Sequence, residues 1–359
     1  MAAVTGAMAQ ATIYGTIEQT YNKTTTTLGG TTISTKTGFT AYQMGQSFLG
    51  VKGSEDMSNG MKASYLYEFG LQSETSATPT NRQSFVGLSG GFGSVRFGKQ
   101  YSSGFNNAIA ADPGGATGAT GALYLAPMTG YNGTEAPLRQ DEGVQWDLPS
   151  FVPGLNVTIT KVFGNANTAL TNTSSTTETN SIKTGDGSGL ALTYSNGPIY
   201  LGYTVDTVVN TGIAFGTNDD SIAQTTTAAA VPATTNTIIA ASSTSKNKLT
   251  TATGTYDLGM AKVGYNTTKM SVGAQSLSTS MVSVSVPLGA ATVFVSQSNG
   301  DITSGSTLGA VSLKGSQYGV NYALSKRTVT YMHAGRLNAD LATTIKKQSN
   351  YGVGIHHSF

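Results

Sequence analysis

The sequence has no cysteine, few charged residues and no long hydrophobic run. The absence of cysteine excludes a disulfide framework and a thiolate metal site. No run of about 18 apolar residues occurs, which excludes a membrane protein built from helices. Charged residues make up 11% of the chain, against about 25% in an average soluble protein. Because the net charge is only +2, we expect no nucleic-acid partner.

The residues that are present favour β-structure. The hydrophobic fraction of 38% is below the usual level of about 45–50%. The chain nevertheless has 17 tyrosines, 12 phenylalanines and one tryptophan, which is not typical of a disordered protein. This composition fits an all-β protein whose strands are half apolar and half polar.

Short alternating segments bounded by Gly, Asn, Asp and Ser follow one another without a charged linker. They predict a single β domain over residues 10–359 with about 16 strands, and a Thr/Gly-rich loop at Lys23–Lys36. The later strands are expected within residues 190–205 and 249–359. The strands expected in the first half are Thr12–Asn22, Phe39–Lys52, Met61–Leu71, Arg82–Ser89, Gly93–Tyr101, Arg139–Asp147 and Leu155–Phe163.

Three stretches have the composition of long loops. Ser102–Leu138 is rich in Gly and Ala and too uniform for a helix, and connections above about 12–15 residues are usually functional or disordered. Asn165–Gly187 and Asn210–Lys246 are rich in Thr, Ser and Ala, which is typical of surface loops. Tight turns alternate with long loops, and this pattern indicates a transmembrane β-barrel.

A barrel in a membrane also explains the composition. A strand of about 9–11 residues spans the bilayer, and the sheet must close because no backbone group can be left unpaired in hydrocarbon. Every second side chain then meets lipid and cannot carry charge, whereas the others meet water. The tyrosines and phenylalanines would form girdles at the two membrane interfaces.

Both ends of the chain resemble targeting signals. Ala7-Met8-Ala9 matches the pattern cut by signal peptidase, so we expect residues 1–9 to be the tail of a truncated signal peptide; a chance match is the alternative. The last strand ends in phenylalanine and resembles the signal that the outer-membrane barrel assembly machinery recognises, although alternation alone fits any half-buried strand. The residues on its signal face are Tyr351, Val353, Ile355, His357 and Phe359.

Several motifs together resemble those of Gram-negative general porins. They are Ile13–Glu18 (IYGTIE), Leu49–Asp56 (LGVKGSED), Phe85–Val95 (FVGLSGGFGSV), Gly143–Phe151 (GVQWDLPSF) and Tyr351–Phe359. The resemblance implies a homotrimer of 16-stranded barrels in the outer membrane, surrounded by lipid and lipopolysaccharide. Each barrel would hold a water-filled pore, with short periplasmic turns, long external loops and the third loop, about residues 102–138, folded into the lumen.

The resemblance further implies a constriction whose charged side chains sort small hydrophilic solutes and ions. Phe48 stands where the family usually has an arginine, and the usual acidic cluster of the loop is absent. The candidate constriction residues are Arg82, Arg139, Lys52, Phe48, Asp112 and Glu135. Three cations against two carboxylates predict a weak anion preference. In the alternative view, the arginines lie at turns or interfaces, Lys52 extends from a strand end, and Asp112 only forms a turn with Pro113.

Two functions remain open from the residues. The first is a porin for passive diffusion; the second is a structural or adhesive surface barrel that acts through its Thr/Ser/Ala-rich loops. An enzyme is not expected, since the three histidines, His333, His356 and His357, show no spacing typical of a catalytic triad or a metal site. We expect no cofactor.

Overall fold

The computed structural model describes residues 11–40, 44–71, 78–115, 138–164, 186–210, 245–272, 275–303, 311–340 and 345–359. The signal-peptide tail expected at residues 1–9 lies outside these residues, as does most of the two Thr/Ser/Ala-rich stretches. No helix within the described ranges is long and apolar enough to cross a membrane.

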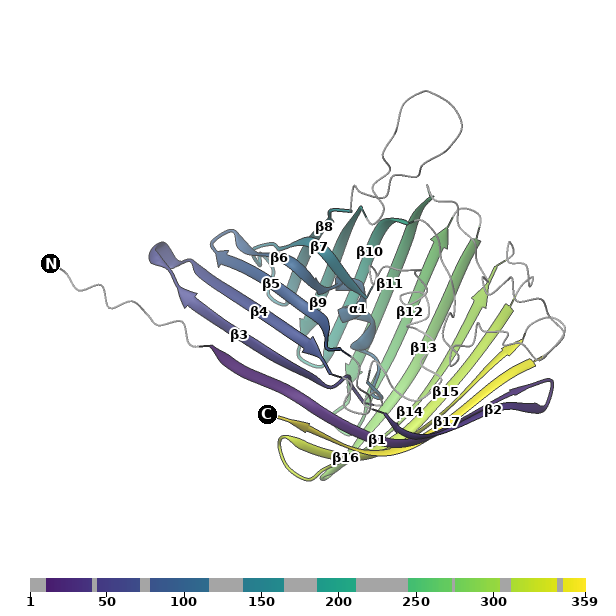
Figure 1. Cartoon of the computed structure of the whole chain (residues 1–359). Helices are drawn as coiled ribbons and strands as arrows, with labels where there is room; N and C mark the ends of the chain where they lie inside the picture. Colours follow the sequence, from purple (N-terminus) through teal and green to yellow (C-terminus); the bar gives the residue numbers. More distant parts are fainter. Residues whose placement is uncertain are drawn as a thin grey trace.

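One antiparallel sheet contains all the strands and closes on itself, because β1 pairs with β17 (Figure 1). A short 3-10 turn, Ser58–Gly60, joins β3 to β4. The strands are β1 (Thr12–Leu28), β2 (Thr31–Thr40), β3 (Phe48–Asp56), β4 (Lys62–Gly70), β5 (Thr80–Gly90), β6 (Gly93–Tyr101), β7 (Arg139–Asp147), β8 (Leu155–Val162), β9 (Gly187–Asn196), β10 (Ile199–Asn210), β11 (Ser245–Asp257), β12 (Lys262–Val272), β13 (Gln275–Leu288), β14 (Ala291–Ile302), β15 (Val311–Ala323), β16 (Thr328–Asp340) and β17 (Ile345–Ser358).

The ring has sixteen positions because β2 and β3 share one of them. Both pair with the same edge of β1: Thr20 lies opposite Thr40 of β2, and Thr16 lies opposite Phe48 of β3. Residues 41–47 are therefore inserted opposite only three residues of β1. The predicted continuous strand Phe39–Lys52 is wrong at this point, since β2 ends at Thr40 and β3 begins at Phe48.

The loop predicted at Lys23–Lys36 is also wrong. β1 continues to Leu28, the chain turns at Gly29 and Gly30, and β2 begins at Thr31. Both glycines have positive φ, 57° and 91°, which glycine adopts without steric cost. The many threonines of this segment are β-branched and favour an extended backbone, so a composition typical of loops forms a hairpin here.

The exposed apolar side chains lie mainly on the outer face of the ring, and most of the buried polar side chains lie on its inner face. Ile13 and Val86 are 66% and 59% exposed, whereas Glu18 is fully buried and Arg82 is 7% exposed. Such a barrel presents its apolar side to lipid, as the alternating sequence predicts. Tight turns lie at the end of the barrel that also holds the carboxyl terminus; they span residues 57–61, 91–92, 148–154, 197–198, 258–261, 289–290 and 324–327.

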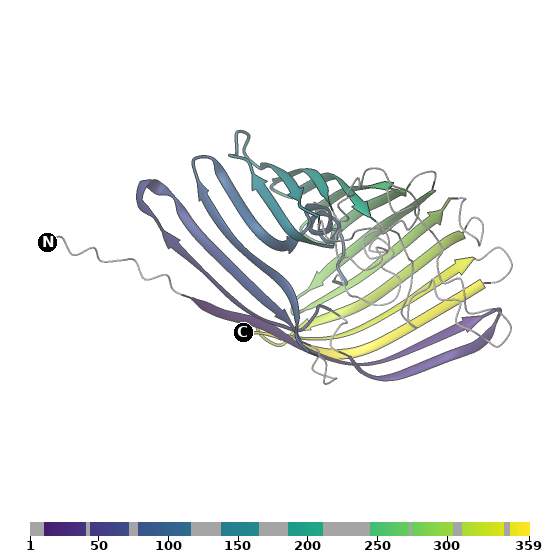
Figure 2. The same cartoon turned by 45° about the horizontal axis from the view of Figure 1, so that its top comes forward.

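After β6 the chain enters the barrel and forms a short helix, α1 (Ser103–Ile109), which lies within the ring (Figure 2). The expectation that this stretch holds no helix is wrong. Ser102 caps α1, since its hydroxyl accepts a hydrogen bond from the Phe105 N–H at 3.0 Å. The helix packs against the inner face of β9–β12. The inward course of the loop is thus seen up to residue 115, and residues 116–137 lie outside the described part.

Candidate functional site

Arg82 reaches the inner face through a β-bulge in β5. The pairing of β4 with β5 shifts between Glu68 and Phe69, so that Arg82 is the extra residue. A bulge redirects side chains relative to regular alternation. As a result Arg82 and its neighbour Gln83 both contact the carboxylate of Glu68, with Nε–Oε2 at 3.3 Å and Nε2–Oε2 at 3.1 Å.

Arg82 and Arg139 lie side by side and share two hydrogen-bond acceptors. The hydroxyl of Tyr101 accepts from Arg82 at 2.6 Å and from Arg139 at 3.2 Å. The side-chain oxygen of Gln46 accepts from both guanidinium groups as well, at 3.4 Å from Arg139. The ring of Phe48 packs against Arg82, with its centre 4.8 Å from the guanidinium carbon. The structure thus brings three of the predicted constriction residues together.

Two further cations lie on the wall between the arginine pair and the tight-turn end of the barrel. The Lys52 ammonium lies 4.4 Å from the ring centre of Tyr14, whose hydroxyl donates to Glu68. Arg96, which the sequence analysis did not single out, forms an ion pair with Asp147 at 2.9 Å. Arg82 and Arg96 are thus paired with carboxylates, Glu68 and Asp147, that the sequence analysis did not identify.

Asp112 lies elsewhere on the inner wall. Its carboxylate accepts from Gln317 of β15 at 2.8 Å and from the Gly114 N–H at 2.9 Å. The loop is also tied to β13, where the Ser283 hydroxyl donates to the Ala111 carbonyl at 2.5 Å. Asp112 thus anchors the loop against the wall opposite the region of the arginine pair. Glu135, the other predicted carboxylate, lies outside the described residues.

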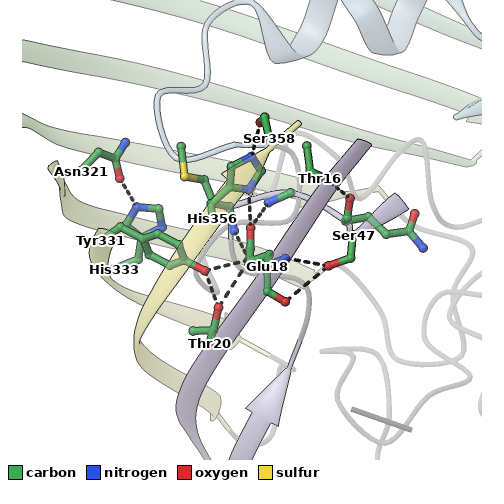
Figure 3. Close-up of polar contacts among 12 residues, drawn as sticks. Thr16, Glu18, Thr20, Ser47, Asn321, Tyr331, His333, His356 and Ser358 are labelled. Carbon is green, nitrogen blue, oxygen red and sulfur yellow. Dashed lines mark hydrogen bonds and ion pairs between the residues drawn. The ribbon is translucent and has the colours of Figure 1, made fainter. Parts of the chain in front are cut away.

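Glu18 is fully buried in the lumen, at the seam where β1 meets β17 (Figure 3). Its Oε1 accepts from the Met44 N–H at 2.9 Å and the Tyr331 hydroxyl at 2.8 Å. Its Oε2 accepts from the Gly45 N–H at 3.0 Å and lies 3.1 Å from His356 Nδ1. Sequence reasoning missed Glu18 and Gln46 because their contacts depend on the insertion at residues 41–47. It missed Glu68 because a β-bulge turns Arg82 toward it.

The last strand closes the barrel as its pattern predicts. Tyr351, Val353 and Ile355 are 57%, 54% and 47% exposed on the outer face. Phe359 exchanges two backbone hydrogen bonds with Gly15, at 3.1 and 3.2 Å. The alternation predicted for this strand is confirmed; whether it is read by an assembly machinery stays a prediction.

In the described part of the chain each histidine contacts neighbouring polar side chains, and His356 lies between the Glu18 carboxylate and the Ser358 hydroxyl, at 3.1 and 3.4 Å. His333 Nε2 contacts the Asn321 side chain at 2.7 Å, and His357 Nδ1 contacts the Thr328 hydroxyl at 2.9 Å. No group of three or more histidine, aspartate or glutamate residues that could hold a metal is found among the described residues.

Comparisons with known proteins agree with this architecture. A family profile described as Gram-negative porin matches residues 1–342. The chain is 37% identical over 152 residues to the major outer membrane protein P.IB of Neisseria lactamica, covering 40% of this chain and 42% of that protein. It is 43% identical over 96 residues to P.IB of Neisseria gonorrhoeae, covering 26% and 27%. The chain thus spans less than half the length of these relatives.

Solved structures share the fold along nearly the whole chain. An anion-selective porin from Comamonas acidovorans is 20% identical, with a TM-score of 0.73 over 98% of this chain and 100% of that one. The trimer form of OmpT from Vibrio cholerae is 14% identical, with a TM-score of 0.64 over 98% and 99%. At these identities the likeness concerns the barrel fold.

Proposed function

Because this chain belongs to the family of Gram-negative porins, we propose that it forms a water-filled channel with a weak anion preference. The barrel lies in the outer membrane, and small hydrophilic solutes and ions would cross it by passive diffusion. The observation that carries the proposal is the inner face of the ring, where Arg82 and Arg139 lie on one wall and α1 and the loop after it lie against β9–β12 and β15.

The arrangement of charges supports a weak preference rather than strict selection. Arg82 forms an ion pair with Glu68, and Arg139 donates hydrogen bonds to the side chains of Gln46 and Tyr101. A unit charge at about 4 Å is worth about 1–4 kcal/mol in a wet constriction. Salt near 0.15 M screens it further, with a Debye length of about 8 Å. The net positive field is therefore small, and neutral solutes should also pass.

The adhesive alternative has less support. Its binding residues would lie in the Thr/Ser/Ala-rich loops, whereas the described features are a closed ring and an arginine pair on its inner face. Family and fold favour a channel over an enzyme.

We further propose a homotrimer, lipopolysaccharide and the barrel assembly machinery as partners. A homotrimer agrees with the trimer form of a neighbour in the fold. Lipopolysaccharide phosphates would bind three exposed cations on the outer face, Lys314, Arg336 and Lys347. Lys314 and Lys347 lie on either side of Asn338, because β16 pairs with both β15 and β17. The barrel assembly machinery would recognise the last strand, and residues 1–9 would be the signal-peptide tail.

Purified protein in planar bilayers tests the channel. Discrete conductance steps are expected, together with swelling of liposomes in small neutral sugars. A correctly folded protein that gives neither would support the adhesive barrel instead.

A further inference from the structure

We propose that Glu18 and Gln46 are positioning residues of the constriction. Glu18 holds the inserted segment in the lumen, and Gln46, carried by that segment, holds Arg82 and Arg139 together. The proposal rests on the channel function and adds to it a device that connects the seam of the barrel with the narrowest part of the pore.

Every described residue of the inserted segment, 44–47, is tied to the wall by hydrogen bonds. The backbone N–H groups of Met44 and Gly45 donate to the Glu18 carboxylate. The Gln46 carbonyl accepts from the Thr16 hydroxyl at 3.3 Å. The hydroxyl of Ser47 accepts from the Glu18 N–H at 2.9 Å and donates to the Glu18 carbonyl at 3.3 Å. Glu18 thus provides most of the anchoring acceptors.

The carboxylate is suited to this task by its surroundings. Five donors converge on its two oxygens: two from the inserted segment, Thr20 from β1 itself, Tyr331 from β16 and His356 from β17. Hydrogen bonds to an ionised acceptor are about twice as strong as neutral ones. Because Glu18 is fully buried, any donor that loses its partner here would remain unsatisfied, at a cost of about 1–3 kcal/mol.

The held segment touches both sides of the constriction. Gln46 contacts the two arginines on β5 and β7. The carbonyl of Met44 lies against Gly115, where a side chain would collide with it, so the described end of the inward loop packs on the same segment. Gly115 has a positive φ of 82°. Loosening of residues 44–47 would therefore disturb the arginine pair and the loop together.

The absence of cysteine allows a direct test. Gln46→Cys introduces a single thiol, and its rate of reaction with a water-soluble methanethiosulfonate reports how firmly the segment is held. Adding Glu18→Gln keeps the side-chain size but places an amide NH₂ among donors. We expect the reaction to accelerate about tenfold, which corresponds to about 1.4 kcal/mol. Glu55→Gln, which removes an exposed carboxylate on β3, is the matched control and should not change the rate.

A reversal-potential cycle tests the link to selectivity. Gln46→Ala and Tyr331→Phe, neither of which changes the charge of the lumen, should each move the reversal potential in a salt gradient toward zero, because released guanidinium groups lie closer to Glu68. The double variant should move no further than the larger single change, since both act through one segment. Additive shifts would overturn the proposal.

The outcomes separate this inference from the channel itself. If the thiol reacts equally fast in both backgrounds, Glu18 does not hold the segment and the inference is wrong. If the wild type conducts no current, the proposed function fails while the thiol rates still decide the inference. Should Glu18→Gln not assemble, Tyr331→Phe removes one bond to Glu18; a severalfold acceleration supports the proposal and an unchanged rate contradicts it.

Discussion

At the scale of single residues, the position of α1 depends on the close approach of the Asn107 side chain to the backbone of Gly202. Asn107 on α1 is fully buried, and its Oδ1 accepts a hydrogen bond from the Tyr200 hydroxyl at 3.1 Å. The same oxygen lies over Gly202 of β10, where any Cβ would collide with it. Glycine at this position is therefore what lets the helix lie flat on the wall and leaves the lumen open.

Gly202→Ala should displace α1 toward the centre of the pore. We expect lower single-channel conductance and a loss of about 1–3 kcal/mol in stability, as for other overpacked sites. Gly254→Ala on β11 is the control, because the new methyl group meets nothing closer than 3.5 Å. Equal conductance of the two variants would show that α1 does not border the open path.

At the scale of elements, the last strand joins closure to recognition. The backbone of Phe359 bonds to Gly15, while its ring is 41% exposed. Phe359→Ala keeps both backbone bonds and removes only the ring. We expect it to reduce the amount of barrel in the outer membrane strongly, with unchanged conductance of the molecules that do assemble.

Phe151→Ala is the matched control for this change, since that ring is 70% exposed in a turn at the same end of the barrel. Normal membrane levels of Phe359→Ala would show that the ring is not the assembly signal. Reduced levels of both variants would assign the effect to loss of any exposed aromatic residue.

The sequence predicted strands best where alternation and turn residues agree. β6 (Gly93–Tyr101) and β7 (Arg139–Asp147) match the predicted bounds, because Gly-Gly and Pro-rich turns delimit their tight-turn ends. The threonine-rich hairpin after residue 22 was missed because its composition resembles that of a loop. The insertion at residues 41–47 interrupts an otherwise regular pattern, and its cause, the register of β1 against two different strands, is not local.

The part of the candidate site that could be predicted is the part that the porin motifs imply. Arg82, Arg139 and Phe48 come together as the family motifs imply. Glu68 was missed because a bulge, and not simple alternation, turns Arg82 toward it. Gln46 was missed because its role depends on the insertion.

At the scale of the whole molecule, closure and oligomerisation predict resistance to detergent. All strand edges pair within the ring except where β2 and β3 share one position, and shielded backbone bonds resist disruption. We expect a trimer in SDS at room temperature and a chain of 36.9 kDa after boiling. Crosslinking and native mass measurement that find only a monomer in mild detergent would contradict the trimer.

We propose that a constriction with a small net positive charge governs what crosses the barrel. Reversal potentials across a salt gradient test this most directly. The wild type should prefer anions weakly. Arg82→Gln combined with Arg139→Gln should shift the preference to cations, since Glu68 then lacks its partner. The control pair, Lys326→Gln with Arg327→Gln in an exposed turn, should leave the potential unchanged. A strongly cation-selective wild type, or a double arginine variant with an unchanged reversal potential, would contradict the account.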